Sequence, residues 1–163
     1  MLTIRKAKLS DLKTVVELFE EFMEDEHRNA VRQNPKARPY LIRKKNSTDI
    51  FRKWAIKNIK SKNNAILLPE VNGKAAGYIL IFIKKDVPIY TVGRIGYISD
   101  LFVKKEFRRM KIGSRLMNES IKWFKKRGLK HISLNVYDGN KNARAFYEKH
   151  GMFYYHLEMR RKI

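Results

Sequence analysis

The sequence predicts an α/β (α+β) fold, with one domain over residues 1–163 and a mixed β-sheet at its centre. The chain has 163 residues, of which 44% are hydrophobic, and this is enough for one sizeable core. Segments with strand periodicity and segments with helical periodicity follow each other in the order β, α, α, β, β, β, α, β, α, β. This order combines hairpins with at least one strand–helix–strand crossover, so a mixed sheet is expected.

The N-terminal half is expected to hold one strand and two helices. Residues 1–7 alternate as a strand does, and Ser10 offers a cap for a helix over residues 11–27. Residues 28–46 are basic and interrupted by prolines, so an irregular connection is expected there. A second helix is expected from Ser47 onward. The inward-facing residues are expected to be Leu12, Val15, Val16, Phe19, Phe22 and Met23 in the first helix, and Ile50, Phe51, Trp54 and Ile59 in the second.

The C-terminal half contains the clearest turn signal in the chain. Asn72 and Gly73 accept the positive φ angles of a tight turn between two apolar runs, so residues 65–83 are expected to form a hairpin. The elements expected after it are a strand over 94–103, a helix over 112–127 ended by Gly128, a strand over 129–136, a short helix opening near Asn140 and a last strand over 152–162.

The composition indicates a basic protein without thiol chemistry. With 37 basic and 16 acidic side chains the net charge is +21, so anionic partners are expected, although charge alone does not choose among nucleotides, RNA, acidic proteins and lipids. The absence of cysteine excludes disulfides, thiolate metal sites and cysteine nucleophiles, and the four histidines show no paired metal spacing, so no metal site is expected. No apolar run approaches about 18 residues and the N-terminus lacks the apolar core of a signal peptide, so a cytoplasmic protein without a membrane partner is expected.

A basic, glycine-containing corner precedes the helix expected at residue 112. In "FRRMKIGSRLM", residues 107–117, Arg108, Arg109 and Lys111 stand before a helical first turn that contains Gly113. The N–H groups of a first helical turn have no intrahelical partner, and the helix dipole adds positive potential, so a phosphate group docked there would satisfy both. A diphosphate is the expected guest, and a solvated basic turn is the alternative.

Two motifs together resemble those of the GCN5-related N-acetyltransferase (GNAT) family. "DLFVKKEFRRMKIGSRLM" is similar to the acetyl-CoA signature of that family, and "NKNARAFYEKHGM" is similar to its second signature. The resemblance covers the whole expected element order. It implies a single N-acetyltransferase domain with a mostly antiparallel mixed sheet, helices on both faces and a splayed strand pair, and it implies acetyl-CoA as the acetyl donor with coenzyme A as the product.

The resemblance also implies which residues contact acetyl-CoA. Lys111 stands where the family has its first glycine, so either the turn needs no positive φ there or the backbone bends differently. Met152 replaces the usual Phe after Gly151, which is expected to concern packing only. The expected contacts are Leu101, Phe102 and Val103 on the strand, Arg108, Arg109, Met110, Lys111, Ile112, Gly113 and Ser114 at the corner, and Asn140, Ala143 and Tyr147 in the second motif.

The resemblance implies Tyr147 as the general acid that protonates the departing thiolate, against the alternative that this residue only packs on the last strand. The group that deprotonates the amine is open. Strand alternation points Tyr97, Ser99 and Leu101 to one face and Asp100 to the other, unless a bulge shifts the phase. A water held by Ser99 or Tyr97 could relay the proton, or Asp100 or a carboxylate of the first helix could take it; Asp100 could instead cap or pair with an arginine.

The acceptor is not fixed by the sequence. Polyamines, small amines, protein lysines and N-terminal amines are all compatible with an acidic helix next to a basic connection, and His27 at their junction is a minor candidate. The excess positive charge could contact RNA or an acidic protein, and a homodimer is compatible with the resemblance. The competing hypothesis is a basic RNA- or ribosome-associated binding protein on a GNAT-like scaffold. The acidic residues are Glu17, Glu20, Glu21, Glu24, Asp25 and Glu26, and the basic ones are Arg28, Arg32, Lys36, Arg38, Arg43, Lys44 and Lys45.

Overall fold

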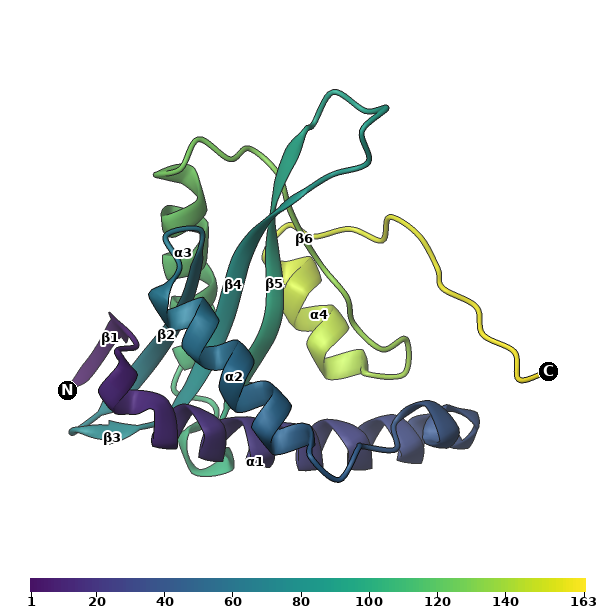
Figure 1. Ribbon diagram of the computed structural model, residues 1–163, viewed down its shortest axis with the longest axis horizontal. Coiled ribbons are helices and arrows are strands. Elements are labelled where there is room, and N and C mark those ends of the chain that lie inside the picture. The colour runs from purple at the N-terminus through teal and green to yellow at the C-terminus, as the bar shows by residue number, and fades with distance from the viewer.

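The computed structural model describes residues 1–163, and it has a central sheet with helices on both faces (Figure 1). No helix in it is both long enough and apolar enough to cross a lipid bilayer. The strands are β1 (Leu2–Lys6), β2 (Asn64–Val71), β3 (Lys74–Ala75), β4 (Gly77–Lys85), β5 (Arg94–Val103) and β6 (Ile132–Leu134). The helices are α1 (Leu12–Gln33), α2 (Ser47–Lys60), α3 (Ile112–Lys125) and α4 (Lys141–Lys149), with 3₁₀ turns η1 (Leu9–Asp11), η2 (Pro35–Tyr40) and η3 (Lys105–Phe107).

The sheet is mixed and mostly antiparallel, as expected. Its strand order is β1-β2-β4-β5-β6, with β3 added to β2, and only the β5–β6 pair is parallel. The hairpin turn is where the Asn–Gly pair predicts it, with φ angles of 50° at Asn72 and 78° at Gly73. These positive φ angles match the right-handed twist of the flanking strands.

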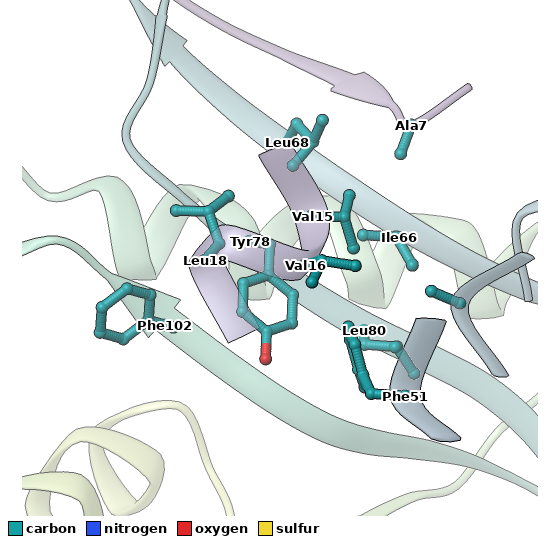
Figure 2. Close-up of a cluster of buried hydrophobic side chains, with 11 residues drawn as sticks. Ala7, Val15, Val16, Leu18, Phe51, Ile66, Leu68, Tyr78, Leu80 and Phe102 are labelled. Carbon is teal, nitrogen blue, oxygen red and sulfur yellow. The ribbon is translucent and has the colours of Figure 1, made fainter. Parts of the chain in front are cut away.

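The two faces of the sheet carry separate hydrophobic clusters. The first lies under α1 and α2, and the second lies against α3, with Phe146 of α4 packed on its edge. Figure 2 shows the first cluster around the ring of Tyr78, whose hydroxyl group lies away from Leu68 and Val15. Tyr78 is fully buried, and its ring lies edge-on to Phe22 of α1 with centroids 6.2 Å apart. Both faces of β4 and β5 therefore pack against a hydrophobic cluster, and this packing holds the two strands in place between the helices.

Strands β5 and β6 separate partway along their length. They pair only where Gly96, Tyr97 and Ile98 lie opposite Ile132, Ser133 and Leu134. Strand β5 continues to Val103 while staying paired with β4 on its other side. No strand pairs with the β6-facing edge of β5 from Ser99 to Val103, and this is the splayed strand pair that the resemblance implies.

The expected end of the first helix and the expected last strand are wrong. Helix α1 continues through residues 28–33, because its first strong stop signal is Pro35, which disfavours helical geometry at Asn34. Residues 152–162 form no strand, since no neighbouring strand offers them a hydrogen-bonding partner. In Figure 1 this segment leaves α4 and extends away from the sheet, and Phe153, Tyr155 and Leu157 are exposed.

Candidate active site

The turn between β5 and α3 presents a row of free backbone donors. Arg109 and Lys111 take positive φ angles of 67° and 58°. The N–H groups of residues 109–114 donate to no protein acceptor, and the last of them form the first turn of α3. Successive free amides of this kind make a concave donor set, and the positive end of the helix dipole adds to it. We call residues 108–114 the anion corner.

The side chains of the anion corner lie in different environments. Arg109, Met110 and Lys111 are exposed, whereas Ile112 is buried in the second hydrophobic cluster. Arg108 is already engaged: its Nε donates to the carbonyl of Val103 at 3.0 Å, and its Nη2 lies 2.6 Å from a carboxylate oxygen of Asp25. Full positive charges therefore surround the free amides, and one of them is held in place by α1.

Helix α4 packs directly on the anion corner. A Cβ atom added to Gly113 would lie 3.4 Å from the ring of Phe146 and 3.8 Å from Leu101. The glycine therefore permits close packing of α4 and β5 against the start of α3, while Ser114 beside it is half-buried. Asn140 begins α4, and its side-chain oxygen accepts a 3.2 Å hydrogen bond from the N–H of the half-buried Ala143. This contact is the N-cap that the second motif supplies.

A β-bulge in β5 changes which side chains share a face. Leu80 pairs with Asp100 and Ile81 pairs with Ile98, so Ser99 is the extra residue. The strict alternation that separates Asp100 from Ser99 is therefore broken, and both line the face covered by α1 and α2. Tyr97 lies on this same face, where its ring is 5.0 Å from that of Phe82 and Lys84 lies over it. Phe102 is buried on this face, whereas Leu101 and Val103 pack toward α3.

Asp100 carries a partly buried carboxylate that two hydroxyl groups support. The hydroxyls of Tyr78 and Ser99 each donate to it at 2.9 Å, and no arginine or lysine pairs with it. Burial raises the pKa of Asp100, and the two donated hydrogen bonds oppose that rise. The alternative role as an arginine partner or helix cap is therefore not what this geometry offers.

Tyr147 lies on α4, next to the splayed strands. It is half-buried, and its ring is edge-on to Phe146 with centroids 5.3 Å apart. Burial, with the nearby charges of Glu26 and Asp100, raises the pKa of Tyr147 to about 12. The phenol is therefore protonated at neutral pH and can donate a hydrogen bond.

Glu26 is the residue of this site that the sequence did not single out. It follows Phe22 by one helical turn, so it continues the apolar stripe of α1 rather than its acidic face, and Ala30 one turn later is buried. Burial and the charge of Asp100 raise the pKa of Glu26 to about 7. A charged residue at a core-facing step of an amphipathic helix was the available signal.

A groove opens beside Asp100, with a volume of about 270 Å³. Its walls are mostly apolar because Ile50 and Trp54, expected to face inward, are instead partly exposed along it at 49% and 36%. Arg43 and Thr48 meet at the carboxylate of Glu20 nearby and tie α2 to α1. The residues that line the groove are Phe19, Ser47, Ile50, Phe51, Trp54, Ser99 and Asp100.

A second, more polar hollow of about 390 Å³ lies along α1. It is lined by His27 with Met23, Glu24, Arg28 and Arg43. None of these residues contacts Asp100 or Tyr147 through a hydrogen bond or ion pair. His27 therefore has no direct polar contact with Asp100 or Tyr147.

Comparisons with known proteins agree with this geometry. Residues 15–152 match the family model described as Acetyltransferase (GNAT) family. An uncharacterized N-acetyltransferase of Methanocaldococcus jannaschii is 30% identical to this chain. The match covers 69% of this chain but only about half (48%) of that relative. The uncharacterized N-acetyltransferase YhfO of Bacillus subtilis is 27% identical, over 92% of this chain and 89% of its own length.

Among solved structures, a predicted acetyltransferase of Clostridium acetobutylicum, crystallised with acetyl-CoA, superposes with a TM-score of 0.78. The match covers 98% of this chain and 96% of that one at 20% identity, so it supports the fold. The family model, by contrast, spans both motifs, the splayed strands and most of the domain. The chain belongs to the GNAT family of acetyltransferases.

Proposed function

We propose that the protein transfers the acetyl group of acetyl-CoA directly to a primary amine, with Tyr147 as the general acid. The observation that carries this proposal is the set of free N–H groups at residues 109–114, directly after the free edge of β5. In a member of this family, the diphosphate of acetyl-CoA would bind at that corner. The amides of its pantetheine arm could then form hydrogen bonds with the unpaired edge of β5, as an added strand does.

The position of Tyr147 supports its role as the acid. Helix α4 rests on the anion corner through Phe146, and Tyr147 of the same helix is close to the charges of Glu26 and Asp100 beside the splayed strands. Expulsion of coenzyme A from the tetrahedral intermediate leaves a thiolate that needs a proton. With its pKa raised to about 12 the Tyr147 phenol is protonated at neutral pH, but it is a weaker acid than the thiol, so its proton transfer to the thiolate is coupled to the proton that the amide nitrogen releases. The oxyanion of the intermediate would be stabilised by N–H groups on the free edge of β5.

The groove beside Asp100 supports entry of the acceptor from the side of α1 and α2. Its aromatic walls suit an apolar or cationic chain, and Asp100 and Ser99 at its inner end suit an ammonium group. A primary amine that enters there meets the free edge of β5 from the face opposite α3. Small amines, polyamines and a lysine side chain share this chemistry.

The test is acetyl transfer to a panel of amines, followed by mass spectrometry: phenethylamine, spermidine, an Nα-blocked lysine amide and a peptide with a free N-terminus. For the acceptor with the highest rate, Tyr147→Phe is expected to lower kcat by about 10²-fold or more while the Kd for acetyl-CoA changes little. Tyr90→Phe, in the exposed loop between β4 and β5, is the matched control. Wild-type kcat in Tyr147→Phe would exclude the phenol as the acid, and no transfer to any amine would refute the activity.

A further inference from the structure

Glu26 stands apart from the other half-buried acidic residues of α1 because it has no partner, whereas Glu24, which is also unpaired, is exposed. Glu20 pairs with Arg43 at 2.7 Å, Glu21 with Lys104 at 2.9 Å and Asp25 with Arg108 at 2.6 Å. Glu26 makes no ion pair and no side-chain hydrogen bond, although the protein carries a net charge of +21. Keeping a half-buried carboxylate ionised without a neighbouring cation costs free energy. Its presence at this step of the helix therefore points to a functional role.

The groups around Glu26 come from every element that borders the splayed strands. Helix α1 brings Glu26 to this place, since the ring of Phe22, one turn earlier, lies 6.2 Å from that of Tyr78 and 6.0 Å from that of Phe102. Glu26 is close enough for its charge to interact with Asp100 on β5, Tyr78 on β4, Tyr147 on α4 and Tyr137 after β6. No lysine, arginine or histidine is paired with this set, apart from Arg160 near Tyr137. The cluster is therefore acidic, and it lacks the cation that a substrate ammonium group would supply.

We propose that Glu26 is the general base that removes a proton from the acceptor ammonium, while Asp100 holds that ammonium in place. This inference rests on the proposed acetyl transfer and adds the group that the sequence left open. The two carboxylates have different roles because their hydrogen bonds differ. Asp100 is committed to the Tyr78 and Ser99 hydroxyls, which stabilise its anion, whereas Glu26 receives no hydrogen bond and stays the more basic of the two.

The proton balance of the reaction follows directly. The acceptor enters as R–NH₃⁺ and gives one proton to the Glu26 carboxylate, which becomes a carboxylic acid. The free amine attacks the thioester carbonyl, so the C–N bond forms and a tetrahedral oxyanion appears. As that intermediate collapses the C–S bond breaks, Tyr147 protonates the thiolate, and the amide nitrogen gives up its second proton, which restores the phenol. Glu26 then releases its proton to solvent, and the net reaction yields amide, coenzyme A thiol and H⁺.

Two carboxylates near each other cannot both ionise freely, and this tunes the base. Burial and the Asp100 charge raise the pKa of Glu26 to about 7, which lies close to a neutral working pH. A carboxylate with an ordinary pKa would remove a proton from an ammonium ion far less readily. An ammonium ion bound by Asp100 would in turn favour the ionised form of Glu26 just before proton transfer.

The experiment compares Glu26→Gln with Glu119→Gln, a matched substitution on α3 on the opposite face of the sheet. With the best acceptor of the panel, Glu26→Gln is expected to lower kcat/KM by about 10²-fold or more at pH 7, with an unchanged Kd for acetyl-CoA. Wild-type kcat/KM should fall below about pH 7 because Glu26 protonates. In Glu26→Gln it should instead keep rising with pH until the amine itself is deprotonated in solution. A merely structural role for Glu26 would not change the shape of the profile in this way.

A second readout does not require turnover. In protein labelled with ¹³C at glutamate side-chain carboxyls, one resonance should titrate near neutral pH, and it should be missing from Glu26→Gln. Titration of that resonance near the ordinary glutamate value would overturn the inference, as would wild-type kcat/KM and pH profile in Glu26→Gln. If Tyr147→Phe is slow while Glu26→Gln is not, the proposed acetyl transfer stands and only this inference fails. If wild-type protein acetylates no amine, both fail.

Discussion

The hydroxyl group of Tyr78 donates a 2.9 Å hydrogen bond to Oδ2 of Asp100. The ring of this tyrosine is fully buried in the cluster under α1 and α2, so the bond connects the hydrophobic core to the carboxylates of the site. The bond also sets the direction in which the Asp100 carboxylate points. Packing of the core and chemistry at the splayed strands are therefore coupled through one phenol.

Tyr78→Phe is expected to destabilise the protein more at pH 8 than at pH 3. Without this donor the pKa of Asp100 rises further, because burial then acts against one hydrogen bond instead of two. A hydrogen bond to a charged group contributes about 1.5–3 kcal/mol, and this is lost only where Asp100 is ionised. Urea unfolding at both pH values measures the difference, with Tyr90→Phe as the control. An equal loss at both pH values would mean that Asp100 has the same charge at both, which contradicts the expectation.

Glu26→Gln is expected to stabilise the fold above pH 7. The pKa of Glu26 is raised from 4.5 to about 7, so the folded state binds this proton more tightly than the unfolded state does. Stability is therefore lost as the pH rises from about 4.5 to about 7, and glutamine removes that loss. The gain at pH 8 is at most about 3 kcal/mol, and it should be near zero at pH 4. Urea unfolding over this range measures it, and a variant that is less stable at pH 8 would contradict the raised pKa.

Much of the fold could be predicted because its signals are local. The Asn72–Gly73 turn depends on two residues that tolerate positive φ angles, and the stripe of α1 depends on helical spacing alone. The anion corner was predictable for a similar reason, since the first turn of any helix has free N–H groups. In each case the chemistry of a short segment dictates its own geometry.

The bulge at Ser99 could not be predicted in the same way. It depends on how β5 is registered against β4, and it decides that Asp100 shares a face with Tyr97. The role of Glu26 is equally non-local, because its surroundings come from β4, β5 and α4. The strand expected over 152–162 failed for the same reason: its alternating pattern is suitable, but a strand needs a neighbour.

Lys111→Gly is expected to stabilise the protein by about 1 kcal/mol. Lys111 has φ 58° and ψ 16°, a left-handed conformation that costs a non-glycine residue about 1–2 kcal/mol. Glycine removes this cost but makes the unfolded chain more flexible, so the gain is partial. Thermal unfolding measures the stability. Calorimetry at low and high salt separates the contribution of the lysine ammonium to acetyl-CoA affinity from that of the backbone. If Lys111→Gly binds acetyl-CoA more weakly at low salt only, the lysine side chain reaches the diphosphate. A lower unfolding midpoint temperature in Lys111→Gly than in the wild-type protein would contradict strain at Lys111.

Asp25→Asn is expected to strengthen acetyl-CoA binding. The Asp25 carboxylate lies 2.6 Å from Arg108 and 3.5 Å from Lys105, so it competes with a diphosphate for the positive charge of the anion corner. Exposed ion pairs of this kind are worth about 0.2–1 kcal/mol, which corresponds to an increase in affinity of up to about fivefold. Calorimetry in about 50 mM salt measures the change, which should fade near 1 M salt because the charges are screened. Asp49→Asn on α2, whose nearest cation is Arg52 at 3.9 Å, is the control. Weaker binding in Asp25→Asn at either salt concentration would mean that Asp25 positions Arg108 for the diphosphate instead of competing with it.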